Sequence, residues 1–193
     1  MRIGVLGKGR IGGTLGKKWQ SAGHDVVFGT RIPDASVPSQ VSVPQAIGSS
    51  SVVLFAVPAS AVPQIIQANL AGLAAKVLID ATNNMAGPAM SSVDLLSTEV
   101  PSSKVFRAFN SLGWENFAAP AFGHDRADLF YCGPPDKEAT GVVEELIEAI
   151  GLRPVRIGEL DKVDLLDSVT KLWFTLAIER GMGRHTAFKV LSD

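Results

Sequence analysis

Three glycines near the start of the chain have the spacing of a phosphate-binding turn. Gly7, Gly9 and Gly12 follow the apolar run at residues 3–6 and open a segment of helical period. In a dinucleotide-binding fold, the first glycine permits the tight turn, the second lets the backbone approach a pyrophosphate, and the third lets the helix pack closely on the strand. Free N–H groups at the start of the helix would hold the anion. Because the motif lies between a strand and a helix, it indicates a dinucleotide site rather than a glycine turn that binds nothing.

The end of the next predicted strand favours NADP over NAD. An NAD site usually carries an Asp or Glu at this point, which accepts hydrogen bonds from the ribose. Here the strand at residues 26–28 is followed by a glycine and then by Thr30 and Arg31, and the nearest acid, Asp25, lies at the other end of the strand. Arg31 could pair with a 2′-phosphate or stack on the adenine, and Thr30 could donate a hydrogen bond. The alternative is a solvated arginine paired with Asp34.

The rest of the chain alternates predicted strands with predicted helices. This alternation indicates the α/β class, with a Rossmann-type, doubly wound, mostly parallel sheet and a C-terminal helix. The later strands are predicted at residues 52–57, 76–80, 105–109, 129–132 and 154–157, and the helices at residues 44–48, 60–73, 92–97, 136–150 and 160–181. Residues 114–123 are predicted to be irregular. We divide the chain into an NADP-binding domain at residues 1–158 and a helical appendage at residues 159–193, which either belongs to the same domain or contacts a second copy.

The carboxyl ends of parallel strands meet at one edge of the sheet, where they form the ligand crevice. Residues after three further strands should therefore join the glycine turn. The predicted cofactor-binding residues are Gly7, Lys8, Gly9, Arg10, Ile11, Gly12, Thr30, Arg31, Ala56, Val57, Pro58, Ala81, Thr82, Asn83 and Asn110. The simpler alternatives are that Pro58 only ends a strand, that the asparagines only form turns, and that Lys8 and Arg10 are ordinary surface residues.

No pattern in the sequence supplies an evident catalytic acid or base, and none has metal-ligand spacing. Tyr131 is the one tyrosine and lies inside a predicted strand, which excludes a Ser–Tyr–Lys arrangement, and Cys132 has the character of a core residue. Among the histidines, only His124 is retained as a candidate. A flavin-like ring accepts hydride directly, so the protein needs mainly to orient it. The sequence therefore favours hydride exchange with a second small-molecule redox carrier.

Composition narrows the class of protein. The chain has 193 residues, of which 46% are hydrophobic, enough for one domain with a substantial core. Its net charge of −1 argues against a nucleic-acid or membrane-surface partner. A single cysteine fits a reducing compartment, no apolar run approaches the roughly 18–20 residues of a membrane span, and Met1 opens directly onto a strand rather than a signal peptide. We therefore expect a cytoplasmic location.

Several motifs together resemble the coenzyme F420-dependent NADP reductases. Besides the glycine turn, these motifs are Gly23-His24-Asp25-Val26, Gly29-Thr30-Arg31, Ala56-Val57-Pro58, Asp80-Ala81-Thr82-Asn83, Ala108-Phe109-Asn110-Ser111, Gly151-Leu152-Arg153-Pro154-Val155 and Gly181-Met182-Gly183. The resemblance implies a Rossmann fold, NADP at Gly7–Gly12 and Thr30-Arg31, a second ligand stacked on the nicotinamide, and often a dimer. Lys8 and Arg10 differ from the residues that the family's reductases tend to carry inside the turn. The same domain also occurs in ferric-reductase-type proteins, where the acceptor is a flavin and a membrane part is attached.

Two functions from different classes follow. The leading hypothesis is an NADP-dependent oxidoreductase that transfers hydride between NADPH and a flavin-like or deazaflavin (coenzyme F420) carrier. The alternative is a non-catalytic NADP(H)-binding redox sensor or partner-binding module. The terminal helix is apolar on more than one side, with Leu165, Leu172 and Trp173 on one stripe and Ile178 on another. Such a helix is either buried centrally or shared with a partner, which favours a homodimer over simple packing on the sheet.

Overall fold

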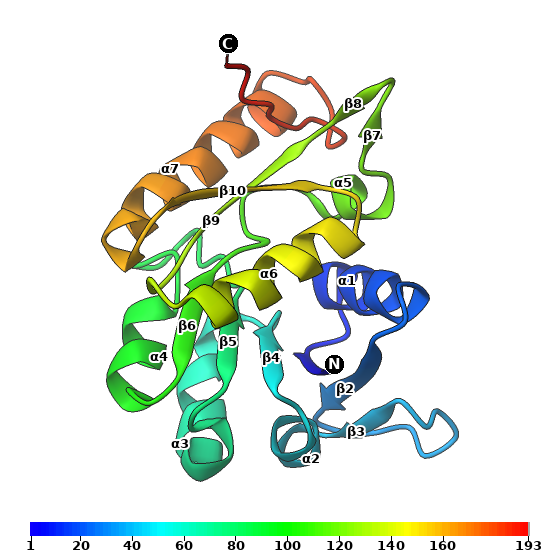
Figure 1. Ribbon diagram of the computed structural model, residues 1–193, viewed down its shortest axis with the longest axis vertical. Coiled ribbons are helices and arrows are strands. Elements are labelled where there is room, and N and C mark those ends of the chain that lie inside the picture. The colour runs from blue at the N-terminus through cyan, green and yellow to red at the C-terminus, as the bar shows by residue number, and fades with distance from the viewer. Residues whose placement is uncertain (193) are drawn as a thin grey trace.

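Eight strands form one sheet in the order β10-β9-β6-β5-β4-β1-β2-β3 (Figure 1). The computed structural model describes residues 1–192. The strands are β1 (Arg2–Leu6), β2 (Asp25–Thr30), β3 (Gln40–Ser42), β4 (Val52–Phe55), β5 (Val77–Asp80), β6 (Lys104–Arg107), β9 (Asp128–Cys132) and β10 (Arg153–Gly158). Neighbouring strands are parallel except β6 and β9. The predicted Rossmann-type, mostly parallel sheet is thus confirmed, while β9 and β10 run opposite to the other six strands.

The strand order places a ligand crevice at the centre of the sheet. The run β3-β2-β1-β4-β5-β6 is the order of dinucleotide-binding folds, in which the chain moves outward from β1 in one direction and then from β4 in the other. Because the connections after β1 and β4 diverge to opposite sides, the carboxyl ends of these two strands leave an open crevice between them. This is the edge at which the glycine turn lies.

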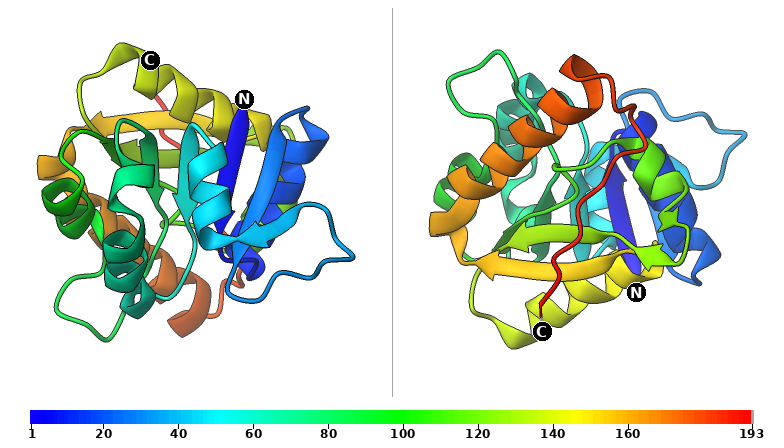
Figure 2. Two further views of the ribbon diagram at one scale, coloured as in Figure 1. Left: turned by 90° about the horizontal axis from the view of Figure 1, so that it is seen from below. Right: turned by 90° about the horizontal axis from the view of Figure 1, so that it is seen from above.

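Helices cover both faces of the sheet. The helices α2 (Val43–Ser49), α3 (Val62–Leu73) and α4 (Val93–Glu99) pack on one face, and α1 (Arg10–Ser21) and α6 (Lys137–Ala149) pack on the other (Figures 1 and 2). Strand side chains alternate between the two layers: Val52 and Leu54 join the α1 layer, and Val53 and Phe55 join the α3 layer. Burial on both faces explains why these strands are continuous apolar runs in the sequence.

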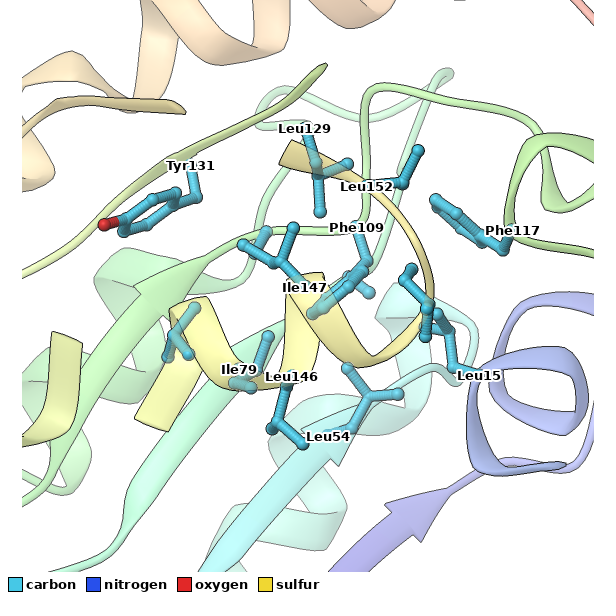
Figure 3. Packing of buried hydrophobic residues seen from close by; sticks show 14 of the residues in the cluster. Leu15, Leu54, Ile79, Phe109, Phe117, Leu129, Tyr131, Leu146, Ile147 and Leu152 are labelled. Carbon is cyan, nitrogen blue, oxygen red and sulfur yellow. The ribbon is translucent and has the colours of Figure 1, made fainter. Parts of the chain in front are cut away.

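The core of the α1 layer surrounds an unusual residue, Phe109. Leu15 of α1, Leu54 of β4 and Leu146 of α6 converge there, as Figure 3 shows. Phe109 has a left-handed backbone (φ 61°), which is rare for a bulky side chain, and its ring packs edge-on against Trp19 with centroids 5.6 Å apart. Dense packing of this kind is what can hold such a conformation. The chain therefore turns sharply just before Asn110.

The prediction that residues 114–123 are irregular is wrong. They form α5 (Trp114–Ala118) and begin a short hairpin of β7 (Ala121–Phe122) and β8 (Asp125–Arg126), with His124 exposed at its turn. Only five residues long, α5 shows no helical period of its own and is held by burial of Phe117 against Phe109, with ring centroids 6.0 Å apart. Strand β3 was also not predicted, because three half-buried residues give no clear alternation.

The C-terminal part packs onto the sheet as a helix followed by a tail. A 3-10 turn (Leu160–Lys162), helix α7 (Val163–Phe174) and one π-helical turn (Thr175–Glu179) follow one another without a break. The helix predicted at residues 160–181 is therefore confirmed, and it ends two residues earlier than predicted. The tail then crosses β9 and β10 (right panel of Figure 2), and the amide of Asp128 donates to the carbonyl of Phe188 at 2.9 Å. Within residues 1–192, no helix is long and apolar enough to cross a membrane.

Candidate functional site

The glycine turn has the geometry of a phosphate-binding loop. Gly7 has a φ of +96°, and a Cβ there would lie 2.4 Å from the carbonyl oxygen of Ala56. A Cβ on Gly12 would lie 2.1 Å from the carbonyl oxygen of Gly7, whereas one on Gly9 meets nothing within 4 Å. Gly9 is also the N-cap of α1 and provides no side-chain cap. The N–H groups of the first helical turn are therefore free for an anion, in open space beside Gly9.

A cleft of about 650 Å³ lies at this edge of the sheet. Of the predicted cofactor-binding residues, its lining includes Gly7, Lys8, Gly9, Thr30, Arg31, Ala56, Val57 and Pro58. The sequence reasoning missed the lining from α2 and α3, which consists of Val43, Pro44, Ser60, Ala61, Gln64, Ile65, Ala68 and Asn69. The available signal was position: Val43 and Pro44 open α2, and the other residues belong to the 3-10 turn and the first eight residues of α3 after β4, a region that borders the crevice.

Thr30 and Arg31 present unsatisfied polar groups to this cleft. The Thr30 hydroxyl is buried and has no hydrogen-bond partner in the described part of the chain. Asp34 does not pair with Arg31; its carboxylate accepts hydrogen bonds from the Ser36 amide and hydroxyl at 2.9 and 2.6 Å. These bonds, and more weakly the charge of Lys8, lower the pKa of Asp34. A hydroxyl and a free guanidinium at the end of β2 fit the 2′-phosphate of NADP.

The next two strand ends are held together by a buried arginine. Arg107 is fully buried, and its Nη1 donates to Asp80 Oδ2 at 3.1 Å and to the carbonyl of Thr82 at 2.5 Å. Its Nη2 donates to Asp167 Oδ1 of α7 at 2.8 Å and to Asn83 Oδ1 at 3.0 Å. Burial raises the pKa of Asp167, and the adjacent guanidinium opposes that rise. Sequence reasoning missed this network because Asp80, Arg107 and Asp167 are far apart in the chain.

Asn110 and Asn83 belong to the same network. The Nδ2 of Asn83 donates to the carbonyl of Asn110 at 2.9 Å, and the Nδ2 of Asn110 donates to the Thr170 hydroxyl at 2.8 Å. Five of the eight buried polar side-chain atoms that lack a partner within residues 1–192 lie between Asn110 and Asn116, including Asn110 Oδ1 and the Ser111 hydroxyl. Such a concentration of unpaired groups requires an explanation, and a polar ligand or ordered water supplies one.

The remaining predicted residues lie around the cleft rather than in its lining. Arg10 borders a second hollow on α1, while Ile11 and Gly12 form the first turn of that helix. Ala81 and Thr82 are buried, and Thr82 donates its hydroxyl to Asp80 Oδ1 at 2.7 Å. Their part in cofactor binding stays a prediction. Among residues 1–192, no group of three or more His, Cys, Asp or Glu side chains could hold a metal ion.

Residues 2–84 match the family model described as NADP oxidoreductase, coenzyme F420-dependent. The resemblance to this family is confirmed. A candidate F420-dependent NADP reductase from Arthrobacter sp. FB24 has the same fold, with a TM-score of 0.84 and 21% identity over the whole of both chains. A reductive aminase of Aspergillus terreus in complex with NADPH has a TM-score of 0.71 at 20% identity, covering 93% of this chain and 62% of that chain.

One curated relative is the metalloreductase STEAP3 of Rattus norvegicus, which is 29% identical over 171 residues. The match covers 82% of this chain, which spans about a third (34%) of the length of that relative. The match to the F420-dependent family model supports an NADP-dependent oxidoreductase, and the solved structures support the shared fold. The cytoplasmic location stays a prediction.

Proposed function

We propose that this protein is an NADP-dependent oxidoreductase that transfers hydride between NADPH and a flavin-like or deazaflavin ring. The observation that carries the proposal is the cleft where β1 and β4 diverge, because it joins a glycine turn built for a pyrophosphate to a free arginine and a partnerless hydroxyl. Bound NADPH would supply the hydride. The protein's own residues then need only hold the dinucleotide and present a polar platform for a second ring.

The two halves of the site have different tasks. The first turn of α1 would hold the pyrophosphate, Thr30 and Arg31 the 2′-phosphate, and Val57 with Ile65 the adenine, since both line the cleft. On the other side of β4, Arg107 joins Asn83 to Asp167 of helix α7, and Asn110 donates directly to Thr170 of the same helix. Rigid positioning of two rings lowers the barrier to hydride transfer without an acid or base from the protein.

The test of this function is oxidation of NADPH, followed by absorbance, with a panel of flavins, deazaflavins and quinones. We expect turnover with at least one tricyclic flavin-type acceptor. The rival function, an NADP(H)-binding redox sensor or partner-binding module, would show tight NADPH binding without turnover of any acceptor. That result would overturn the proposed hydride transfer.

Arg31→Ala should remove most of the preference for NADPH over NADH. We expect the native protein to bind NADPH at least about tenfold more tightly than NADH, since one charge-assisted phosphate contact contributes on the order of 1.4 kcal/mol. Isothermal titration with both dinucleotides measures the preference. Lys137→Ala, which removes an exposed positive charge from α6, is the matched control and should leave it unchanged. Equal affinities in the native protein would contradict the assignment.

We also propose a homodimer through helix α7. Leu166 and Trp173 are buried on one face of this helix, but Leu165 and Leu172 on the adjacent face are 56% and 49% exposed. We expect a mass of about 41 kDa in solution, twice the 20.4 kDa of the chain, and a monomer when Leu165 and Leu172 are both changed to Glu. Light scattering measures both masses. Leu70→Glu, at an exposed leucine on α3, should leave the mass unchanged.

A further inference from the structure

A second hollow lies beside the glycine turn, on the outer side of α1. Its volume is about 670 Å³, and one wall is a single face of α1 formed by Arg10, Gly13, Thr14, Lys17 and Gln20. The opposite wall comes from the connection between β2 and β3, at residues 37–40, which extends outward in both panels of Figure 2. Trp114, the first residue of α5, forms the third side. Lys8 and Gly9 border both this hollow and the cofactor cleft.

The hollow is positively charged and contains no acid to balance it. Lys8, Arg10 and Lys17 line it, and no Asp or Glu does. None of the three cations forms an ion pair with an acid of the described residues. Asp34 is near enough to be influenced by Lys8, but its carboxylate is already bonded to Ser36. Because the whole chain carries a net charge of −1, three unpaired cations around one hollow are a local feature rather than a general basic character.

The aromatic wall links this hollow to the second half of the site. The guanidinium of Arg10 lies 6.0 Å from the ring centroid of Trp114, at the distance of a cation–π contact. The indole Nε1 of Trp114 is buried and has no hydrogen-bond partner within residues 1–192. Trp114 also follows Asn110 by only four residues, so it continues the segment of unpaired polar groups at the end of β6. Trp114 therefore connects the wall of the hollow to the segment that begins at Asn110.

We propose that this hollow binds the phosphate of the hydride acceptor, so that the acceptor is a phosphorylated flavin-type or deazaflavin carrier rather than a neutral ring. This inference rests on the proposed function. Three unpaired cations match a phosphomonoester or phosphodiester, which carries concentrated negative charge. The phosphates of NADP have other proposed partners: Thr30 and Arg31, which line the cleft and not the hollow, for the 2′-phosphate, and the first turn of α1 for the pyrophosphate.

The substitution Lys17→Gln tests whether the hollow binds the phosphate of the acceptor or a phosphate of NADP. Lys17 lines the hollow and not the cofactor cleft, and Lys18, its neighbour on α1, lines neither, so Lys18→Gln is the matched control. The probes are two pairs of ligands that differ in phosphate: flavin mononucleotide with riboflavin, and the deazaflavin with and without its phosphodiester side chain. Their dissociation constants are measured by titration into the NADP⁺-saturated protein, which does not depend on turnover.

In the native protein, we expect the phosphorylated member of at least one pair to bind about tenfold more tightly than the other member. Lys17→Gln should remove most of this difference while changing the affinity for NADPH less than twofold, and Lys18→Gln should change neither. Equal binding within both pairs, or no measurable binding of any of the four ligands, overturns the proposal. So does a Lys17→Gln variant that weakens NADPH but not NADH, since the hollow would then serve the 2′-phosphate.

The binding and turnover results separate this inference from the proposed function. A phosphate preference in binding that depends on Lys17, without NADPH oxidation, supports the hollow and overturns hydride transfer. Turnover with flavins, together with equal binding of the phosphorylated and unphosphorylated ligands, supports hydride transfer and overturns the phosphate site in the hollow.

Discussion

Arg107→Met is expected to cost about 3–5 kcal/mol of the free energy of unfolding. The substitution leaves Asp80 and Asp167 buried without their cation, and an uncompensated buried charge costs far more than a broken surface pair. Lys104→Met is the matched control on the same strand: its ion pair with Asp136, 3.2 Å long, is about half exposed on the lysine side and should contribute at most about 1 kcal/mol. Urea denaturation of both variants measures the difference. Similar losses in the two variants would contradict the role assigned to Arg107.

The loss of unfolding free energy in Arg107→Met should also grow as the pH rises. Burial already raises the pKa of Asp167, and the Arg107 guanidinium opposes that rise, so its removal raises this pKa further. A carboxyl with a raised folded pKa stabilises the protein below its unfolded pKa and loses that stabilisation as the pH rises through the folded value. The free energy of unfolding of the variant should therefore be closer to that of the native protein in mild acid than at neutral pH. Adding Asp167→Asn to Arg107→Met should flatten this dependence.

Gly12→Ala is expected to weaken NADPH binding at least about a hundredfold, or about 2.7 kcal/mol. Its Cβ would lie 2.1 Å from the carbonyl oxygen of Gly7 and 3.0 Å from Val5, so α1 must move away from the turn and carry its free N–H groups with it. Titration with NADPH measures the loss. Near-native affinity would show that these N–H groups do not hold the pyrophosphate.

Gly9→Ala distinguishes loss of binding from loss of folding. Gly9 has an ordinary φ of −71°, and a Cβ added there would have no atom within 4 Å. The free energy of unfolding of the variant should therefore lie within about 0.5 kcal/mol of the native value. The added methyl group nevertheless occupies the open space expected to receive the pyrophosphate, and NADPH affinity should fall. Gly48→Ala on α2, where space is also open, is the control that should alter neither property.

The sequence was most informative where one short segment determines the geometry. The glycine turn, the strand before it and the residues at the end of β2 are contiguous, and eight of the predicted residues line one cleft. The central strands could be predicted because helices cover both faces of the sheet, so that these strands are apolar runs in the sequence.

What could not be predicted depends on contacts between distant segments. Arg107 has the appearance of a solvated residue at the end of a strand, and only the packing of Asp167 against it, 60 residues later, shows that it is buried. The reversed direction of β9 and β10 follows from the excursion through α5 and the hairpin, which has no period of its own. Lys17 has the appearance of an ordinary helix-surface lysine until the residues 37–40 and Trp114 enclose the space beside it.

The tail that crosses β9 has a consequence for how the chain matures during synthesis. Arg184 pairs with Glu115, 69 residues earlier, and the carbonyl of Arg184 accepts a hydrogen bond from the side-chain Nδ2 of Asn116 at 3.0 Å. His185 stacks on Phe122 of β7, with ring centroids 4.3 Å apart. The dinucleotide cleft uses only residues before position 70, whereas α5 and β7 receive these partners only at residues 184 and 185. Because synthesis runs from the N-terminus, every residue that lines the cleft is made well before Arg184 and His185, which complete the contacts of α5 and β7.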